Sequence, residues 1–273
     1  MRATTIIQGV VTCMGGASPL DGRISWAAEE PGRFESFNSF LVRGSSVAIV
    51  IDTGVAAHRQ TLLRQIGEAL GSDRRVEVML TRRQEFDSES NLGAIMQEFD
   101  VRHVYLRDSV RREDNFDSVI GIGRDYPVEF HHIKNGDRLG LGGGVELEFF
   151  ETPLRLLSTL WAYERSSHVL FTSDSFGHVT LVGENDARIC TEDDDHTSFE
   201  QVRTRALRKL WWLPEGDTSS VYEQLRKIFE DRDVKVIAPS HGKAIIGRDL
   251  VSRHVDMMLA VVAGDKSLVR GKV

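Results

Sequence analysis

The chain has 273 residues and predicts a layered α/β (α+β) protein. In the first half, apolar strand-like runs alternate with segments of helical spacing. A second β-rich region follows, and the last third is mostly helical around one more buried strand. Each half is β-rich first and helical afterwards, which is compatible with a pseudo-symmetric αβ/βα sandwich.

The first half begins with a hairpin pattern. Two apolar runs, 37–44 and 47–54, are separated by a Gly-Ser-Ser turn, which is typical of paired antiparallel strands. Residues 57–70 then carry apolar side chains at helical spacing, and Gly71 suits the end of that helix. The alternation is completed by a strand, a helix and a strand, over 76–81, about 89–99 and 101–106.

The second half supplies further strands before most of its helices. Apolar runs predict strands over 128–133, 145–152, 157–163, 168–174 and 234–239. Glycines between 140 and 144 predict a turn before the second of these strands. Helical spacing predicts helices over 198–213, 218–231 and about 249–263. The acidic run 192–195 repels itself, so we expect a solvated loop there.

Composition narrows the class of protein. Hydrophobic residues make up 41% and charged residues 27% of the chain, which provides a sizeable core and argues against disorder. We expect one domain over 1–273, with its core at about 35–260. The net charge of −7 argues against nucleic acid as a partner. With no long apolar run and only two cysteines, the chain predicts a cytoplasmic protein without membrane contact or a disulfide framework.

Acidic side chains and one histidine stand at the ends of predicted strands. Asp52 follows the second strand of the hairpin, and Glu85 and Asp87 follow the strand at 76–81. Asp174 and His241 end two strands of the second half. Strand ends on one edge converge, and a set of carboxylates with an imidazole suits iron, manganese or zinc. Asp52 is expected either at the rim of this site or in a structural turn.

Three motifs in this order resemble the metallo-β-lactamase fold, in the branch of the flavodiiron and oxygen-binding di-iron proteins. That branch carries His-x-Glu-x-Asp-His, where this chain reads Arg83-x-Glu85-x-Asp87-Ser88. Its Leu-Phe-Ser-Asn-Asp-Ala-Phe-Gly is similar to 170–177, and its Ala-Pro-Ser-His-Gly matches 238–242. The similarity spans about 35–260 and implies the four-layer αβ/βα sandwich of that fold.

The departures from the family pattern imply a depleted metal site. Two histidines of the first motif are replaced, by Arg83 and Ser88, and the segment after Pro153 holds no histidine near Leu156. By the resemblance, the first iron position keeps Glu85 and the bridging aspartate. We expect the guanidinium of Arg83 to fill that position and pair with these carboxylates.

The second iron position keeps three of its four ligands by the same resemblance. The retained ligands are Asp87, Asp174 and His241, which the resemblance also makes the catalytic residues. Including Glu85 of the first position, they form the candidate metal ligands. We expect the site to hold one Fe, Mn or Zn, or no metal, and we expect the chain to bind no flavin because no flavodoxin-like domain follows residue 265.

Three functions stay open at this point. The first is a redox or oxygen-related role on dioxygen or nitric oxide. The second is a metal-dependent hydrolase for a small anionic or nitro-type substrate. The third is a metal-free, non-catalytic subunit of a heteromer with a second lactamase-fold chain; a homodimer is the alternative assembly. The candidate substrate-binding residues are Arg82, Arg83, Arg155 and His178.

Overall fold

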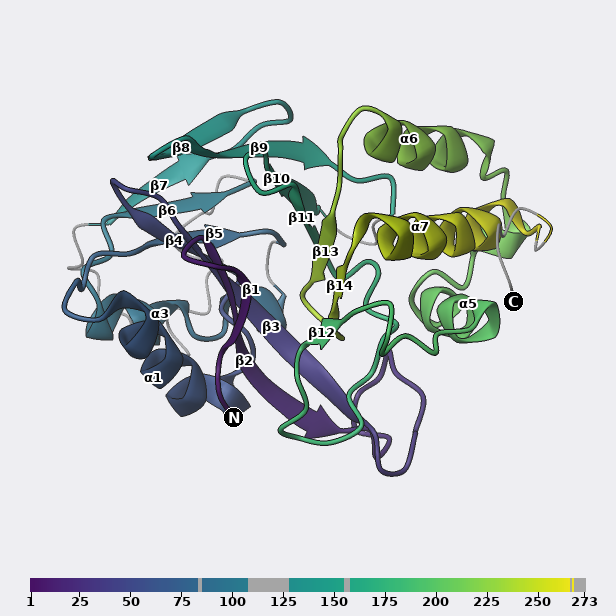
Figure 1. Ribbon diagram of the computed structural model, residues 1–273, viewed down its shortest axis with the longest axis horizontal. Helices are drawn as coiled ribbons and strands as arrows, with labels where there is room; N and C mark the ends of the chain where they lie inside the picture. The colour runs from purple at the N-terminus through teal and green to yellow at the C-terminus, as the bar shows by residue number, and fades with distance from the viewer. Residues whose placement is uncertain (83–84, 108–127, 155–157, 266, 268–273) are drawn as a thin grey trace.

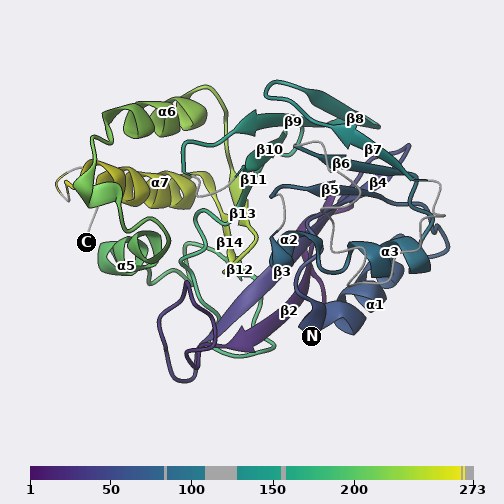
Figure 2. The same cartoon turned by 180° about the vertical axis from the view of Figure 1, so that it is seen from behind.

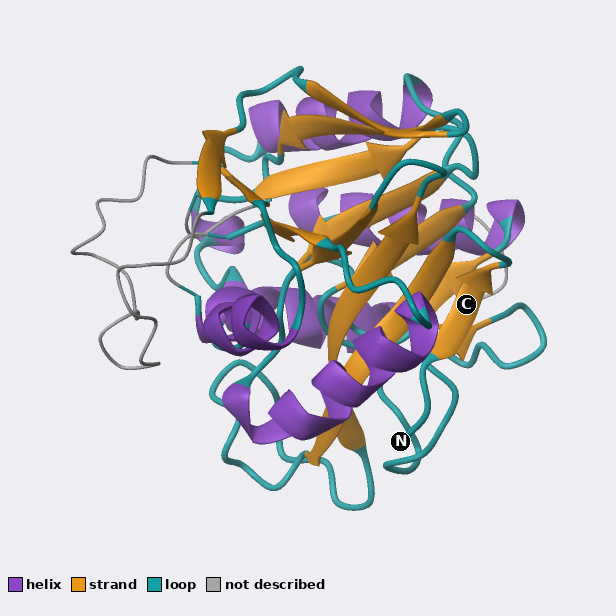
Figure 3. Ribbon diagram, turned by 90° about the vertical axis from the view of Figure 1, so that its left-hand side faces the viewer, coloured by secondary structure: helices purple, strands orange, loops and turns teal. Residues whose placement is uncertain are grey.

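Two seven-stranded sheets lie face to face, and helices cover both outer surfaces (Figure 1). The structure is a computed structural model that describes residues 1–82, 85–107, 128–154, 158–265 and 267. Seen from the side in Figure 3, the strands lie between helices in front and helices behind. The expected αβ/βα arrangement is therefore present, because each sheet buries one face against the other sheet and one against helices.

The first sheet follows chain order from β1 to β7. Its first four strands pair antiparallel, and β4 to β7 pair in parallel. The strands are β1 (Thr4–Ile7), β2 (Val11–Pro19), β3 (Phe34–Arg43), β4 (Ala48–Ile51), β5 (Glu77–Leu80), β6 (His103–Leu106) and β7 (Glu129–His132). Parallel neighbours need crossovers, and two of these run through α1 (Arg59–Leu70) and through α2 (Phe86–Glu89) with α3 (Leu92–Glu98).

The second sheet has the order β12-β14-β13-β11-β10-β9-β8. Its strands are β8 (Arg138–Gly142), β9 (Val145–Glu151), β10 (Leu160–Glu164), β11 (Val169–Ser173), β12 (Ile189–Cys190), β13 (Val236–Pro239) and β14 (Ala244–Ile246). Its outer face is covered by α5 (Phe199–Lys209), α6 (Ser219–Glu230) and α7 (Arg248–Ala263), which gather on one side in both Figure 1 and Figure 2.

The core consists of three main apolar layers. The layer between the sheets includes Phe40 and Phe171, whose ring centroids are 5.2 Å apart. A second layer joins the first sheet to α1 and α3, and a third joins the second sheet to α5, α6 and α7. No helix among the described residues is long and apolar enough to cross a membrane. Burial on both faces explains why the parallel strands read as continuous apolar runs in the sequence.

Several local predictions were wrong. Strands β1, β2 and β14 were not expected, and Gly140 and Gly142 belong to β8 rather than to a turn. Asp87 lies in the short helix α2, not in the turn before it. The acidic run 192–195 is a loop, as expected, but the side chain of Asp195 is only 1% exposed because it lies against Arg253 and His254 of α7. The helix predicted over 198–213 ends at Lys209 as α5, and Trp211 beyond it is 71% exposed.

Candidate functional site

Asp52 joins the ends of three strands, β4, β5 and β13, at the junction of the two sheets. Its carboxylate accepts hydrogen bonds from the Thr81 backbone at 2.9 Å and the Thr81 hydroxyl at 2.7 Å. Hydroxyls from beyond β5 and β13 also donate to it, Ser88 at 2.5 Å and Ser240 at 2.9 Å. Asp52 has a φ of 55°, a strained value for a residue with a side chain. These bonds give Asp52 a structural role, which was one of the two expectations for it.

Arg82, Asp87 and His241 form the central site. The Oδ2 atom of Asp87 receives a hydrogen bond from Arg82 Nη2 and lies against His241 Nε2, each at 2.6 Å. All three residues are at most 5% exposed. Burial by itself raises the pKa of Asp87, but Arg82 and His241 outweigh burial and hold that pKa far below its ordinary value. The central site is therefore a buried, charge-compensated hydrogen-bond network.

The charge of Arg82 is locked in this position. Burial by itself lowers the pKa of Arg82, but nearby carboxylates, Asp87 above all, outweigh burial and raise it further above its ordinary value. Arg82 Nη2 is also 3.9 Å from Asp52 Oδ2. A guanidinium stays protonated at any pH of interest, so the central site carries a permanent cation.

His241 is held from the first sheet. Asn38 of β3 donates its side-chain amide to two carbonyl groups of the loop that carries His241, at 2.7 and 2.8 Å. The imidazole packs against the rings of Trp26 and Phe37, with centroid distances of 5.1 and 5.4 Å. Its Nδ1 atom is buried with no hydrogen-bond partner among the described residues. This packing fixes the ring so that Nε2 faces Asp87.

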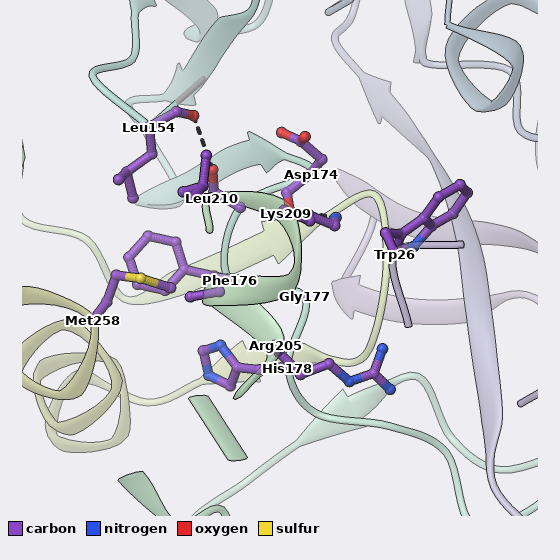
Figure 4. Close-up of a pocket in the computed structure, with 12 residues that line it drawn as sticks. Trp26, Leu154, Asp174, Phe176, Gly177, His178, Arg205, Lys209, Leu210 and Met258 are labelled. Carbon is purple, nitrogen blue, oxygen red and sulfur yellow. Dashed lines mark hydrogen bonds between the residues drawn. The ribbon is translucent and has the colours of Figure 1, made fainter. Parts of the chain in front are cut away.

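Asp174 lies beside a lysine that the sequence did not single out. Lys209 of α5 donates to the backbone carbonyl of Asp174 at 2.9 Å (Figure 4). Burial lowers the pKa of Lys209, and the nearby carboxylate of Asp174 opposes that shift only in part. The Oδ1 atom of Asp174 is buried without a hydrogen-bond partner in the part of the chain that the structure describes. Ser173, with a φ of 52°, turns the chain sharply into Asp174.

A small cavity of about 40 Å³ opens between Asp174, Lys209, His178 and Trp26 (Figure 4). Its remaining wall is mostly apolar and includes Leu154, Phe176, Leu210 and Met258. A water molecule needs roughly 10–15 Å³ of such space, so the cavity has room for a few waters or one very small ligand. The site thus combines a permanently charged network with a small adjoining cavity whose mostly apolar wall carries a few polar groups.

His178, His254 and Asp195 form a chain of buried contacts, which we call the relay. His178 is the end of the relay at the cavity wall. Its Nε2 atom is 2.7 Å from His254 Nδ1, and the two rings stack with an interplanar angle of 8°. His254 Nε2 is 3.3 Å from Asp195 Oδ2. Burial lowers the pKa of His178 well below its ordinary value, and His254 adds to that shift. His178 Nδ1 has no hydrogen-bond partner among the residues that the structure describes.

The structure brings together most of the site residues that the sequence indicated. Asp87 meets His241, while Asp174 and His178 line the cavity. Glu85 is partly buried, and that burial raises its pKa. Arg83 and Arg155 lie outside the described residues, so the expected pairing of Arg83 with Glu85 stays a prediction. Arg82, a candidate substrate-binding residue, bonds to Asp87, and its contact with a substrate stays a prediction.

The described residues do not fit a di-iron pair. Asp87 Oδ2 is already in contact with Arg82 Nη2 and with His241 Nε2, each at 2.6 Å, so the guanidinium of Arg82 competes with an iron for this oxygen. Ser88 stands where the family has a histidine, and its hydroxyl donates to Asp52. In the described part of the chain, the ligand atoms close enough to share an ion belong to His103, Glu129 and His131, away from this site.

Comparison with known proteins identifies the relatives. The family model described as ODP family beta lactamase matches residues 36–242. The chain belongs to this family. It is 26% identical over 229 residues to an anaerobic nitric oxide reductase flavorubredoxin of Enterobacter sp., covering 83% of this chain and 44% of that protein. It is 22% identical over 224 residues to a putative diflavin flavoprotein of Nostoc sp., covering 82% and 35%.

Solved structures of flavodiiron cores share the fold. Rubredoxin oxygen:oxidoreductase from Desulfovibrio gigas superposes with a TM-score of 0.69 at 20% identity, over 94% of this chain and 61% of that one. A fragment of a Nostoc sp. diflavin flavoprotein gives 0.69 at 18% identity, over 96% and 98%. These matches confirm the predicted lactamase-like fold, and the family model with the curated relatives confirms the flavodiiron branch. The chain spans less than half the length of the two curated relatives named above.

Proposed function

We propose that this protein is a relative of the flavodiiron proteins that does not use a di-iron centre. Its role is oxygen- or nitric-oxide-related, and it acts by binding a small polar ligand. The observation that carries the proposal is the double contact on Asp87 Oδ2, from Arg82 and His241 at 2.6 Å each. Buried carboxylates need a cation, and here a side chain provides it permanently. The negative charge of Asp87 in the central site is therefore compensated without a metal.

The cavity beside the central site is the proposed ligand position. Its wall offers both donors and acceptors: Trp26 Nε1 and Asp174 Oδ1 are buried without a hydrogen-bond partner among the described residues. Buried polar groups are normally satisfied, so these atoms favour a polar occupant, either ordered water or a ligand. With about 40 Å³ of space, that ligand has only a few non-hydrogen atoms.

The relay behind the cavity determines what His178 can do. His254 Nε2 lies 3.3 Å from the Asp195 carboxylate without the geometry of a hydrogen bond, and the negative charge of that carboxylate favours a proton on this nitrogen. His254 Nδ1 is then an acceptor, so His178 Nε2 donates across the 2.7 Å contact. The proton of neutral His178 therefore lies on Nε2, and Nδ1 keeps its lone pair. His178 is set up to accept a hydrogen bond, or a proton, from a ligand in the cavity.

A single-metal site is the second candidate, and one observation favours it. Asp174 Oδ1 is a buried acceptor without a described partner, and such an atom suits a cation. Asp87, Asp174 and His241 would hold the ion, which would supply a Lewis acid for hydrolysis or a redox centre. Arg82 would have to leave Asp87 to admit it, and for that reason the metal-free function ranks first.

Metal content decides between the two candidates. Protein expressed in iron-, manganese- and zinc-replete medium without a histidine tag is analysed by elemental mass spectrometry, as wild type and as Asp174→Asn. His131→Ala is introduced in both proteins, to remove the other group of candidate ligands. We expect far less than one equivalent of metal in both. One equivalent that disappears in Asp174→Asn establishes the single-metal candidate, and two equivalents overturn both proposals.

A further inference from the structure

His103, Glu129 and His131 form a cluster at the free edge of the first sheet, which we call the edge cluster. His103 Nδ1 is 2.8 Å from His131 Nε2. Glu129 Oε2 is 3.6 Å from the first of these atoms and 3.7 Å from the second. All three ligand atoms lie within 4.8 Å of one another. Two imidazoles and a carboxylate thus point at one position.

The strand register explains why these side chains meet. β6 and β7 pair in parallel, with His103 opposite Glu129 and Tyr105 opposite His131. Side chains two residues apart share a face of a strand, so Glu129 and His131 lie on one face of β7. Tyr105 stacks on His131 with centroids 4.9 Å apart and an angle of 22°. The pairing of the two strands and the stacked Tyr105 ring together hold the cluster in place.

We propose that the edge cluster is a binding site for a divalent transition metal of the zinc class, separate from the central site. Two histidines and one glutamate are a known ligand set for zinc, with a fourth position for water or substrate. Tetrahedral ligands at bond lengths of 2.0–2.2 Å are about 3.3–3.5 Å apart. The three observed separations, 2.8, 3.6 and 3.7 Å, bracket that value. Small side-chain rotations therefore suffice to seat the ion.

The net charge of the edge cluster and the protonation of its histidines are also compatible with metal binding. Among the described residues, the ion-pair partners of Glu129 are the two histidines, so no arginine or lysine of that part of the chain neutralises it. The short contact between the rings uses one N–H as the donor. When an ion binds, that ring moves its proton to its other nitrogen, and both facing nitrogens become ligands. The metal takes the place of the shared hydrogen bond without requiring release of a proton.

The exposure of the edge cluster favours a site that solvent and ligands reach. The side chains of His103 and His131 are 29% and 38% exposed, and that of Glu129 is 73% exposed. The β7 strand ends the sheet order among the described residues. The fourth coordination position therefore faces outward, open to water or to an anionic group. Such exposure also means that substitutions here should leave the fold intact.

Titration with Zn²⁺ and Co²⁺ tests the site. Tag-free, metal-stripped protein is titrated by calorimetry with Zn²⁺, and Co²⁺ binding is followed by its visible absorbance. We expect one equivalent to bind, with Co²⁺ bands typical of a four-coordinate site. His103→Ala and His131→Ala should each weaken binding by at least tenfold, and Glu129→Gln should weaken it less. Thermal unfolding curves of the apo variants verify that each one is folded.

His132→Ala is the matched control, because His132 is the next residue on β7 and points to the opposite face. We expect it to bind metal as the wild type does. Equal affinity in His131→Ala and wild type, or an equal loss in His132→Ala, would overturn the edge-cluster site. Asp174→Asn should leave this binding unchanged, so failure here is distinguishable from failure of the proposed function.

Discussion

The central site and the edge cluster both gather carboxylates and imidazoles, yet they balance charge in opposite ways. In the central site, Arg82 donates directly to Asp87, and both side chains are buried. In the edge cluster, Glu129 faces two histidines that carry no permanent charge. A fixed guanidinium makes the first site independent of a metal, whereas the second lacks a cation that an ion would supply. Ligand residues alone therefore do not define a metal site, because the neighbouring charges decide whether an ion is needed.

Arg82→Gln should have the largest effect, because it removes the fixed cation that distinguishes the central site from the edge cluster. Removing one partner of a buried ion pair leaves an uncompensated charge, so we expect the free energy of unfolding to fall by about 3–5 kcal/mol. Denaturant unfolding measures the change. Arg64→Gln is the control: Arg64 pairs with Glu68 on the surface of α1, 2.7 Å apart, and should cost about 0.5 kcal/mol or less. Equal losses in the two variants would show that Arg82 does not compensate Asp87.

The same substitution also tests metal binding. Without Arg82, the central site contains a carboxylate and an imidazole but no fixed cation, as the edge cluster does. In a His131→Ala background, Arg82→Gln should take up a divalent ion that the protein with Arg82 does not. Elemental analysis after exposure to Mn²⁺ or Zn²⁺ measures this gain. If uptake stays unchanged, the guanidinium is not what excludes the metal.

Zinc should stabilise the protein through the edge cluster. A ligand that binds only the folded state raises the free energy of unfolding by about 2.7 kcal/mol at a concentration of 100 Kd. We expect Zn²⁺ to raise the unfolding midpoint of the wild type and of His132→Ala, and a chelator to reverse the effect. His131→Ala should not respond. A response of the same size in His131→Ala would place the stabilising ion elsewhere.

The relay at the cavity makes a pH-dependent contribution to the free energy of unfolding, intermediate in size among the effects expected here. The folded pKa of His178 is depressed by burial and by His254, whereas the unfolded value is about 6.5. The unfolded chain therefore binds a proton that the folded one does not. The stabilisation is present above about pH 6.5 and is lost, by roughly 1.4 kcal/mol per pH unit, as the pH falls from there toward the folded pKa.

His178→Gln tests this contribution by difference. Wild type should lose stability more steeply than His178→Gln between pH 6.5 and 5. His58, whose pKa is lowered by burial and by Arg188, is present in both proteins and cancels. His196→Gln, at an exposed position, should keep the wild-type slope. Parallel curves for wild type and His178→Gln would contradict a buried neutral His178.

The smallest expected effect concerns α5, the helix that carries Lys209 to the cavity. Ser198 caps this helix: its hydroxyl accepts from the Gln201 backbone, while the Gln201 side chain accepts from the Ser198 backbone. Ser198→Ala should lower the free energy of unfolding by about 1 kcal/mol. Ser220→Ala on α6 is exposed and should change it by roughly 0.5 kcal/mol or less. Thermal denaturation compares the two, and an equal loss would argue against the cap.

Much of the fold was predictable because its signals are local. The hairpin of β3 and β4, helix α1 with its end at Gly71, and strand β13 before His241 all follow from apolar periodicity and turn residues. Strands β1 and β2 were missed; β2 includes two consecutive glycines and ends in a proline, so its pattern is weak. Its pairing with β3 comes from tertiary context.

The candidate site was predictable in position but not in its partners. Sequence motifs located Asp87, Asp174 and His241 because they follow strands whose ends converge. The sequence pointed to Arg83 as the compensating cation, whereas the described network uses Arg82, since that residue faces Asp87. Lys209 lies on a helix, 35 positions after Asp174 in the chain, and no local sequence pattern predicts that the two residues meet.

The layered fold, the family and the loss of two histidines at the metal motif could be established from the amino-acid sequence. These follow from periodicity and from residue identities at fixed spacing. The balance of the remaining charges became visible in the three-dimensional arrangement of the chain. That balance depends on distances of a few ångströms between segments far apart in the chain, such as Asp87 and His241 or Asp195 and His254. Burial makes those distances matter, because a charge removed from water is stabilised mainly by its immediate neighbours.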